Sequence, residues 1–335
     1  MGNTNIYKQS PYDRELATVL QQMSPGGKPF PLTLETIPMM RRNFATMSLS
    51  DDQLQRGGQI DIKLCKVPGR QGAPEISLLI CRPSASQTTK SGSLLPCIYY
   101  MHGGGMISGD NRFSIQFLLD WIVELKIVVI SVEYRLAPEH PHPAPSEDCY
   151  AGLLWTAEHA KDLGIDLTQI SVAGVSAGGG LAAAMALMAR DRHGPKLQGQ
   201  LLICPMLDDR DQTFSTLQYA DIGTWNRQSN QVGWTALLGK KKGTQGVSPY
   251  AAPSRAQDLS NLPPAFIDVS STEIFRDEDI DYAQRIWQTG GVAELHVWPG
   301  AFHAFTVIEP NSRLSQHAVA ASANWYRRLL AFTSK

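Results

Sequence analysis

The sequence predicts an α/β fold in which a mostly parallel sheet carries helices on both faces. The first observation is an alternation of short apolar runs with amphipathic segments from about residue 94 onward, which is typical of strands joined by crossover helices. The second is a Gly-Val-Ser-Ala-Gly pentapeptide at residues 174–178, between an apolar run (170–173) and an alanine- and leucine-rich run (181–190). A chain that turns from strand to helix over so few residues leaves the central serine exposed on a strained corner.

Residues 1–50 form an accessory segment ahead of the sheet. Residues 12–23 have a helical rhythm, and a Pro- and Gly-rich break follows at residues 24–31. The next stretch is rich in methionine and includes Met47. Methionine adapts to irregular apolar surfaces, so these side chains either line a pocket or pack in the interior. Of these two interpretations we favour packing.

Eight strands are predicted in order after this segment. Residues 60–65 alternate apolar and polar side chains, and residues 75–81 follow after a Pro-Gly turn, which predicts an antiparallel pair with one face in water. From there strands alternate with helices, which predicts parallel pairing. The remaining predicted strands are residues 94–101, 127–132, 170–173, 200–204, 265–269 and 294–298, and the helices among them are residues 114–124, 147–161 and 181–190.

The alternation of strands and helices lapses at residues 206–249. This stretch carries the aromatic residues Phe214, Tyr219, Trp225 and Trp234, with polar residues between them. Aromatic side chains outside a sheet core suit a cap that contacts an apolar ligand. We therefore expect a single domain whose core consists of residues 51–205 and 250–335, with the cap built from residues 1–50 and 206–249. The three lysines at residues 240–242 indicate a solvated face.

Composition restricts the class of protein. At 335 residues and 43% hydrophobic content the chain can bury one large core. Its 30 basic and 31 acidic residues give a formal charge of -1, so it has no electrostatic footprint for nucleic acid. The sequence contains neither a run of 18 apolar residues nor a secretory segment, which predicts a soluble, cytoplasmic protein without a membrane span.

The cysteines indicate a reduced protein without a metal centre. There are five, an odd number, and they are widely spaced and mostly inside apolar runs. This pattern is typical of cysteine packed in a core. No Cys-x-x-Cys pair is present, so we predict no metal and no cofactor.

A second chemical motif, His-Gly-Gly-Gly at residues 102–105, directly follows the predicted strand 94–101. Consecutive glycines leave backbone N–H groups unshielded and able to point into one site, where they can bind a developing negative oxygen. The alternative is phosphate binding, but the glycine spacing does not match the Gly-x-Gly-x-x-Gly pattern and the Walker lysine is missing. The motif therefore predicts an oxyanion loop.

Four segments together resemble the hormone-sensitive-lipase-like branch of the α/β-hydrolase esterases. They are the His-Gly-Gly-Gly loop, the run Tyr-Arg-Leu-Ala-Pro-Glu-His-Pro at residues 134–141, the serine pentapeptide, and Glu-Ile-Phe-Arg-Asp-Glu at residues 273–278. The match extends from about residue 60 to the carboxyl terminus. The resemblance implies an α/β-hydrolase fold with an eight-stranded sheet and a helical cap. The last strand and helix also resemble surfaces that the family uses for dimers, which leaves a homodimer open.

A catalytic triad can be assigned from the chain order of this fold, which is nucleophile, acid, base. Ser176 is the candidate nucleophile. Among the eight histidines His303 fits the base, because it follows the strand 294–298 through a Pro-Gly turn. The acid should follow the strand 265–269, and Glu273 stands where the family usually has aspartate. Asp277 is the alternative acid, and its other role would be to cap the following helix.

The oxyanion-hole donors are predicted to be the backbone N–H groups of Gly104, Gly105 and Ala177. His102 and Gly103 are expected to support the loop.

Four residues are predicted to contact the substrate, namely Met106, Tyr219, Trp225 and Phe305. The sequence departs from the family at two points near this pocket. Val175 stands where the branch usually has aspartate, and Met106 stands where an aromatic residue is common. The shape of the accepted substrate is expected to differ accordingly.

The resemblance implies a serine carboxylesterase that hydrolyses short- to medium-chain carboxylic esters through an acyl-enzyme intermediate. Two alternatives stay open on the same fold. One is a non-catalytic receptor for a small molecule, which would have lost the base. The other keeps the chemistry and changes the bond, to a lactone or an acetylated secondary metabolite. A small-molecule ester is the expected partner.

Overall fold

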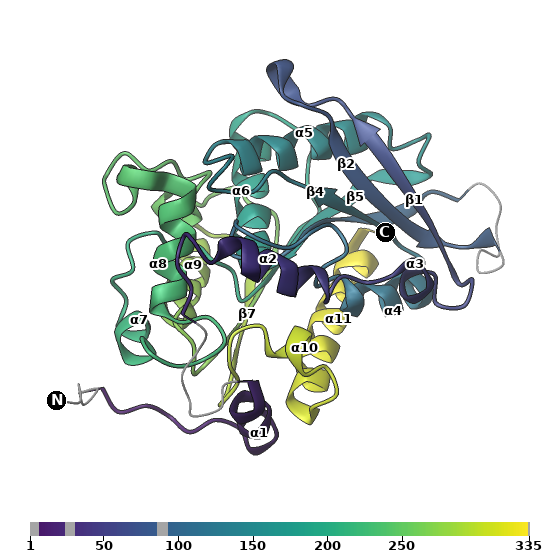
Figure 1. The fold of residues 1–335 in the computed structure, drawn as a ribbon. Helices are drawn as coiled ribbons and strands as arrows, with labels where there is room; N and C mark the ends of the chain where they lie inside the picture. Colours follow the sequence, from purple (N-terminus) through teal and green to yellow (C-terminus); the bar gives the residue numbers. More distant parts are fainter. Residues whose placement is uncertain (1–6, 24–30, 86–92, 334–335) are drawn as a thin grey trace.

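An eight-stranded sheet forms the centre of the protein, in the order β1-β2-β4-β3-β5-β6-β7-β8 (Figure 1). The computed structural model describes residues 7–23, 31–85 and 93–333. The strands are β1 (Ile60–Val67), β2 (Ile76–Pro83), β3 (Leu95–Met101), β4 (Val128–Glu133), β5 (Ile165–Val175), β6 (Gly199–Ile203), β7 (Ala265–Ser270) and β8 (Ala293–Trp298). Strand β2 runs antiparallel to β1 and β4, and every other pair is parallel. The predicted mostly parallel sheet is therefore confirmed.

Helices cover both faces of the sheet, as predicted (Figure 1). Within β3 the side chains alternate, so Tyr99 belongs to the core cluster under α5, α6 and α9, and Tyr100 to the cluster under α4 and α11. None of the helices in the described ranges has the length and apolar character needed to span a bilayer. The helices are α1 (Arg14–Met23), α2 (Ile37–Ala45), α3 (Asp51–Gln55), α4 (Gln116–Leu125), α5 (Ala144–Glu158), α6 (Ala177–Asp191), α7 (Phe214–Gln218), α8 (Arg227–Leu238), α9 (Arg276–Gln288), α10 (Phe305–Ile308) and α11 (Arg313–Thr333).

The boundaries of β5 and α5 differ from the sequence prediction by several residues. Strand β5 begins at Ile165, because its first residues continue the pairing with β3, where Ile165 lies opposite Leu95. Helix α5 spans Ala144–Glu158, whereas residues 147–161 were predicted. Pro145 lies in its first turn, where proline is tolerated because the backbone N–H has no intrahelical partner.

The amino-terminal segment contacts the insertion that follows β6. The side chain of Gln218, at the end of α7, donates to the carbonyl of Lys8, and the side chain of Gln9 donates back to the carbonyl of Gln218. Gln228 of α8 donates to the carbonyl of Leu32. Segments about two hundred residues apart in the sequence therefore lie side by side. The predicted break at residues 24–31 falls mostly on residues 24–30, which are outside the described ranges.

The loops that carry the sequence motifs leave the sheet at one edge. His102 follows β3, Ser176 follows β5, Glu273 follows β7 and His303 follows β8. All four strands are parallel members of the sheet. Because the carboxyl ends of parallel strands meet at the same edge, side chains from four distant parts of the chain can converge there.

Candidate active site

Ser176 occupies the corner between β5 and α6. Its backbone has φ 59° and ψ -121°, a conformation that non-glycine residues rarely adopt. Its backbone N–H donates to the carbonyl of Ile203 at 2.8 Å, and its own carbonyl accepts from Gly180 and Met206. These bonds hold the strained residue in place, and its hydroxyl faces a cavity.

The glycines around this serine are required by close backbone contacts. A Cβ atom on Gly174 would lie 2.1 Å from the carbonyl oxygen of Gly178. A Cβ atom on Gly178 would lie 2.0 Å from the carbonyl oxygen of Met101, at the end of β3. Both distances are far inside van der Waals contact, so only glycine fits at either position. The two glycines of the pentapeptide therefore allow α6 to pack closely against β3 and β5.

His303 lies between Ser176 and Glu273. Its Nε2 is 2.9 Å from the Ser176 hydroxyl, and its Nδ1 is 2.7 Å from Oε1 of Glu273. A carboxylate only accepts, so Nδ1 carries the ring proton and Nε2 is free to accept from the serine. The backbone around the ring is held as well, since Thr224 donates to the carbonyl of His303 and Ser270 donates to that of Phe302.

Glu273 is buried and fixed by two hydrogen bonds. Besides the bond to His303, its second carboxylate oxygen accepts from the backbone N–H of Ser270 at 3.0 Å. The alternative acid, Asp277, lies elsewhere. It accepts from the backbone N–H of Ser215 in the first turn of α7 at 2.7 Å and pairs with Arg276. The structure therefore brings Glu273 to the histidine, and Asp277 ties α7 to α9.

The glycine loop turns back on itself beside Ser176. The carbonyl of Gly104 accepts from the backbone N–H groups of Ile107 and Ser108. Gly104 has φ 115° and Gly105 has φ 65°, both in the region that favours glycine. Among the hydrogen bonds of the described residues, none uses the N–H of Gly104 or Gly105 as donor. Ala177 is the first residue of α6, where a backbone N–H has no intrahelical partner.

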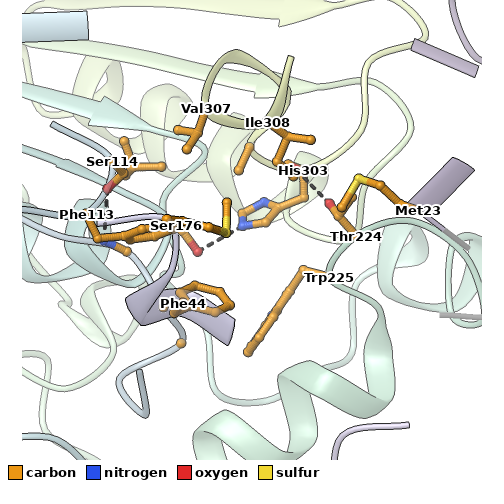
Figure 2. A pocket seen from close by; sticks show the side chains of 16 residues that line it. Met23, Phe44, Phe113, Ser114, Ser176, Thr224, Trp225, His303, Val307 and Ile308 are labelled. Atoms are coloured by element: carbon orange, nitrogen blue, oxygen red, sulfur yellow. Dashed lines mark hydrogen bonds between the residues drawn. The ribbon is translucent and has the colours of Figure 1, made fainter. Parts of the chain in front are cut away.

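These groups surround one cavity of about 160 Å³ (Figure 2). Figure 2 shows Phe44 and Trp225 on one side of Ser176 and His303, with Val307 and Ile308 on the other. Apart from the serine, the histidine, Ser114, Thr224 and the glycine loop, the wall is apolar. The lining residues are Met23, Phe44, Met47, Gly103, Gly104, Gly105, Phe113, Ser114, Val175, Ser176, Thr224, Trp225, His303, Ala304, Val307 and Ile308.

A family model described as the alpha/beta hydrolase fold matches residues 98–307, well over half of the chain and all of the site loops. The chain belongs to the α/β-hydrolase family. This family includes the hormone-sensitive-lipase-like esterases, so the predicted relationship is confirmed.

Esterases are found among the relatives of this α/β hydrolase. Esterase LipI of Mycobacterium tuberculosis is 37% identical over 201 residues, which cover 60% of this chain and 62% of that protein. Carboxylesterase NlhH of the same species is 37% identical over 213 residues, covering 63% and 66%. The matches therefore span slightly less than two thirds of these relatives.

Solved structures of esterases resemble this hydrolase over almost their whole length. A bacterial heroin esterase has a TM-score of 0.85 and 35% identity, covering 95% of this chain and 98% of that one. Esterase LipW from Mycobacterium marinum has a TM-score of 0.82 and 28% identity, covering 96% and 98%. The fold of these proteins is shared with this chain from end to end.

His102 supports the glycine loop of the hydrolase from within. It is fully buried, its Nδ1 donates to the carbonyl of Gly103 at 2.7 Å, and its ring stacks on Tyr134 with 4.1 Å between centroids. The Tyr134 hydroxyl donates in turn to the carbonyl of His102 at 2.7 Å. Burial lowers the pKa of His102 to about 4 from its ordinary 6.5, so the ring is neutral at physiological pH.

The run at residues 134–141 is tied to its surroundings by ion pairs and hydrogen bonds. Arg135 makes a two-pronged ion pair with the buried Asp148. Arg41 of α2 donates to the backbone carbonyls of Ile107 and Ala137. It also forms an ion pair with Glu139 at 2.7 Å, and this pairing lowers the pKa of Glu139 to about 2. Arg41 of α2 therefore contacts both this run and Ile107, which follows the glycine loop. These contacts give the run a structural role.

Only one of the four predicted pocket residues, Trp225, lines the cavity. Met106 has φ 65°, which turns its side chain into the core cluster beneath the sheet. Tyr219 packs in that core under the guanidinium of Arg276, 5.6 Å from the ring centroid. Phe305 begins α10 and packs against the amino-terminal segment. Met106, Tyr219 and Phe305 are not among the residues that line this cavity.

The sequence prediction missed most of the cavity wall. Phe44 and Met47 come from the segment around α2, and Val307 and Ile308 from α10. Met47, for which we favoured packing, lines the cavity. The methionine content of the segment was the one signal that could have identified it, because methionine suits irregular apolar surfaces.

We expect His102 to make the protein acid-sensitive. The unfolded chain binds a proton at this histidine below pH 6.5, but the folded chain does so only below about pH 4. The free energy of unfolding should therefore fall as the pH is lowered through this window, by up to about 3 kcal/mol. Urea unfolding between pH 4 and 7 would measure it. His102→Gln should lose this part of the slope, and His140→Gln, which removes an exposed histidine, should keep it; equal slopes in all three proteins would contradict the assignment.

Proposed function

We propose that this protein is a serine carboxylesterase that hydrolyses short- to medium-chain carboxylic esters. One observation carries the proposal: Ser176, His303 and Glu273 form a buried line of hydrogen bonds of 2.9 and 2.7 Å beside a loop with two unengaged glycine N–H groups. This arrangement supplies a nucleophile, a base, an orienting carboxylate and donors for an oxyanion. The esterase names of its relatives and structural neighbours support the same reaction.

The proposed reaction proceeds in two acyl-transfer steps. Nε2 of His303 takes the proton of Ser176 as Oγ attacks the ester carbonyl, while Glu273 stabilises the imidazolium through Nδ1–H. The N–H groups of Gly104, Gly105 and Ala177 bind the tetrahedral oxyanion, and each such donor can lower the barrier by ~3 kcal/mol. The protonated histidine then releases the alcohol. Water attacks the acyl-enzyme by the same route and regenerates the serine.

We assign the cap to residues 1–50 and 206–249 and the hydrolase core to residues 51–205 and 250–335. Met23 and Phe44 from the first segment and Trp225 from the second lie in the wall of the cavity. The hydrogen bonds between the two segments support their action as one unit. In this arrangement the cap selects the substrate and the core supplies the chemistry.

The receptor alternative lacks an observation in its favour. A receptor on this fold needs no base, whereas here a buried histidine lies within hydrogen-bond distance of the serine and of a carboxylate. A lactone or an acetylated metabolite would use the same groups. The size of the cavity favours compact members of any of these classes.

We place the protein in the cytoplasm. All five cysteines are free, and Cys81, Cys97, Cys149 and Cys204 are buried in the core as the sequence predicted. A reducing compartment keeps such thiols in this state.

We further propose that β8 joins a second copy of the chain. It is the last strand of the sheet, and within the described part of the chain it pairs only with β7. Val297 of β8 and the neighbouring Val292 and Trp287 are exposed apolar side chains, with 39%, 62% and 47% of their surface accessible. Sedimentation should show a dimer for the native protein and a monomer for Val297→Asp. A monomer at micromolar concentration before substitution would contradict this arrangement.

The assignment of the acid can be tested with matched amide variants. Glu273→Gln should reduce kcat on p-nitrophenyl butyrate by roughly 10³- to 10⁴-fold, because it no longer fixes the ring proton on Nδ1. Asp277→Asn has the same change of charge, but its carboxylate does not touch the histidine, so activity should stay near the native value. Mass spectrometry after fluorophosphonate treatment should find the label on Ser176. An inactive Asp277→Asn with an active Glu273→Gln would refute the assignment.

Chain-length preference follows from the cavity. An apolar cavity of about 150 Å³ holds a benzene molecule, so the 160 Å³ here accepts an acyl group of about six carbons or fewer. The kcat/KM values for p-nitrophenyl esters should peak between acetate and hexanoate and fall about tenfold or more at laurate. Phe44→Ala enlarges the wall and should move the optimum to longer chains. Undiminished activity of the native protein on laurate would rule out this limit.

A further inference from the structure

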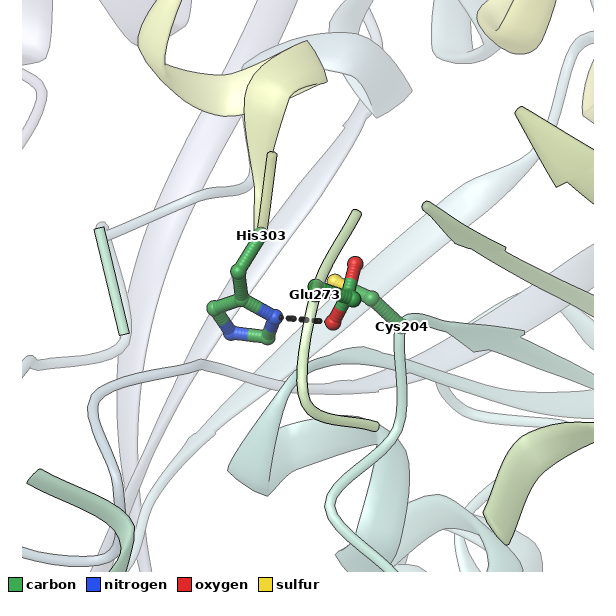
Figure 3. A group of neighbouring side chains, drawn as sticks. All are labelled: Cys204, Glu273 and His303. Carbon is green, nitrogen blue, oxygen red and sulfur yellow. Dashed lines mark hydrogen bonds and ion pairs between the residues drawn. The ribbon is translucent and has the colours of Figure 1, made fainter. Parts of the chain in front are cut away.

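A free thiol, that of Cys204, lies beside Glu273 and His303. Cys204 directly follows β6, and its backbone N–H donates to the carbonyl of Asp268 at 2.8 Å. Its Sγ, a carboxylate oxygen of Glu273 and a ring nitrogen of His303 all lie within 4.8 Å of one another, and all three residues are buried. Figure 3 shows the side chains of Cys204 and His303 both directed toward the Glu273 carboxylate.

The surroundings of this thiol are rich in carboxyl groups. Burial, and then the charges of Glu273, Asp268 and Asp279, hold the pKa of Cys204 well above its usual range. Both carboxyl oxygens of Asp279 are buried without a hydrogen-bond partner. The thiol, the Glu273 carboxylate and the imidazole nevertheless lie together in one buried place and offer three different donor atoms.

The three donor atoms are those that zinc prefers. Thiolate sulfur, imidazole nitrogen and carboxylate oxygen bind Zn²⁺ at about 2.0–2.3 Å, so ligand atoms around one ion lie about 3–4 Å apart. The three donor atoms now lie within 4.8 Å of one another, and Nδ1 of His303 and Oε1 of Glu273, which are 2.7 Å apart, have to separate to reach this range. Hard cations such as Mg²⁺ prefer oxygen ligands in an octahedron and do not suit this set.

We propose that Cys204, Glu273 and His303 form an inhibitory site for Zn²⁺ and similar thiophilic divalent cations. The ion takes no part in catalysis. Metal binding and the hydrogen bond between Glu273 and His303 exclude each other, because both use the same atoms.

Inhibition follows from the tautomer of His303. In the active arrangement the ring proton is on Nδ1 and the lone pair on Nε2 faces Ser176. An ion that binds the Nδ1 lone pair forces the ring proton onto Nε2. Nε2 can then no longer accept the serine proton, so the nucleophile stays unactivated. Cys204 loses its thiol proton to solvent, so one proton is released for each ion bound.

Binding should be slow because the site is closed. Cys204 is 4% exposed, Glu273 3% and His303 5%. An ion can enter only after a local opening that separates Glu273 from the imidazole, so inhibition should develop over time rather than on mixing.

The experiment uses Cd²⁺ as the probe, because its thiolate complexes absorb in the ultraviolet, and Zn²⁺ in parallel. Each protein is incubated with increasing metal, and the residual rate on p-nitrophenyl butyrate is normalised to its own metal-free rate. Cys204→Ser removes the sulfur with little change of volume. The concentration for half inhibition should rise roughly 10- to 100-fold or more in this variant. Cys65→Ser removes the more accessible thiol and should leave the native sensitivity unchanged, and Mg²⁺ should not inhibit.

The activity assay rests on the proposed esterase function, whereas metal binding is measured independently. Equilibrium dialysis should find one Cd²⁺ per native chain and none at this site in Cys204→Ser, with loss of the ultraviolet band. If the protein hydrolyses no ester, these binding measurements still decide the proposal. Native sensitivity in Cys204→Ser, or protection by Cys65→Ser, would overturn it. If the serine variant does not fold, Cys204→Ala serves in the same assays.

Discussion

The hydrogen bonds of one imidazole ring hold the functional part of this protein together. His303 contacts Ser176, which is 127 residues earlier in the chain, and Glu273, which is 30 residues earlier. Neither contact can form unless β5, β7 and β8 are parallel and in register, because each side chain is carried by the loop that leaves the carboxyl end of its strand. The sheet can therefore be regarded as the frame that sets two distances of 2.7 and 2.9 Å.

Close backbone packing around Ser176 also fixes the geometry of the site. Gly174 and Gly178 are placed where any Cβ atom would collide with backbone, so α6 can approach β3 and β5 more closely than a helix with side chains there could. The strain at Ser176 is offset by backbone hydrogen bonds to its neighbours. The loop opposite is stiffened by the stacked rings of His102 and Tyr134. The backbone of Ser176 and that of the glycine loop are thus held by contacts within the protein itself.

Features that depend on local sequence patterns could be predicted from the sequence. Short apolar runs and the helices between them identified all eight strands, and motif spacing led to Ser176, His303 and Glu273, which the structure brings together. The cavity wall was not accessible in this way, because Phe44 and Val307 meet only through the tertiary fold. Tyr219 and Phe305, which were predicted to contact the substrate, lie outside the wall of this cavity for a related reason. An aromatic residue in an irregular segment gives no indication of whether its ring faces a ligand or the core.

Helix α1 contacts both the cavity and the loop that carries His303. Met23 at its end borders the cavity, while Leu16 packs against Phe302, next to the base. At its start, the backbone N–H of Asp13 donates to the carbonyl of Gly300. The same helix therefore contributes to the wall of the cavity and to the packing of the loop that carries the imidazole, so a substitution on its apolar face would alter both together.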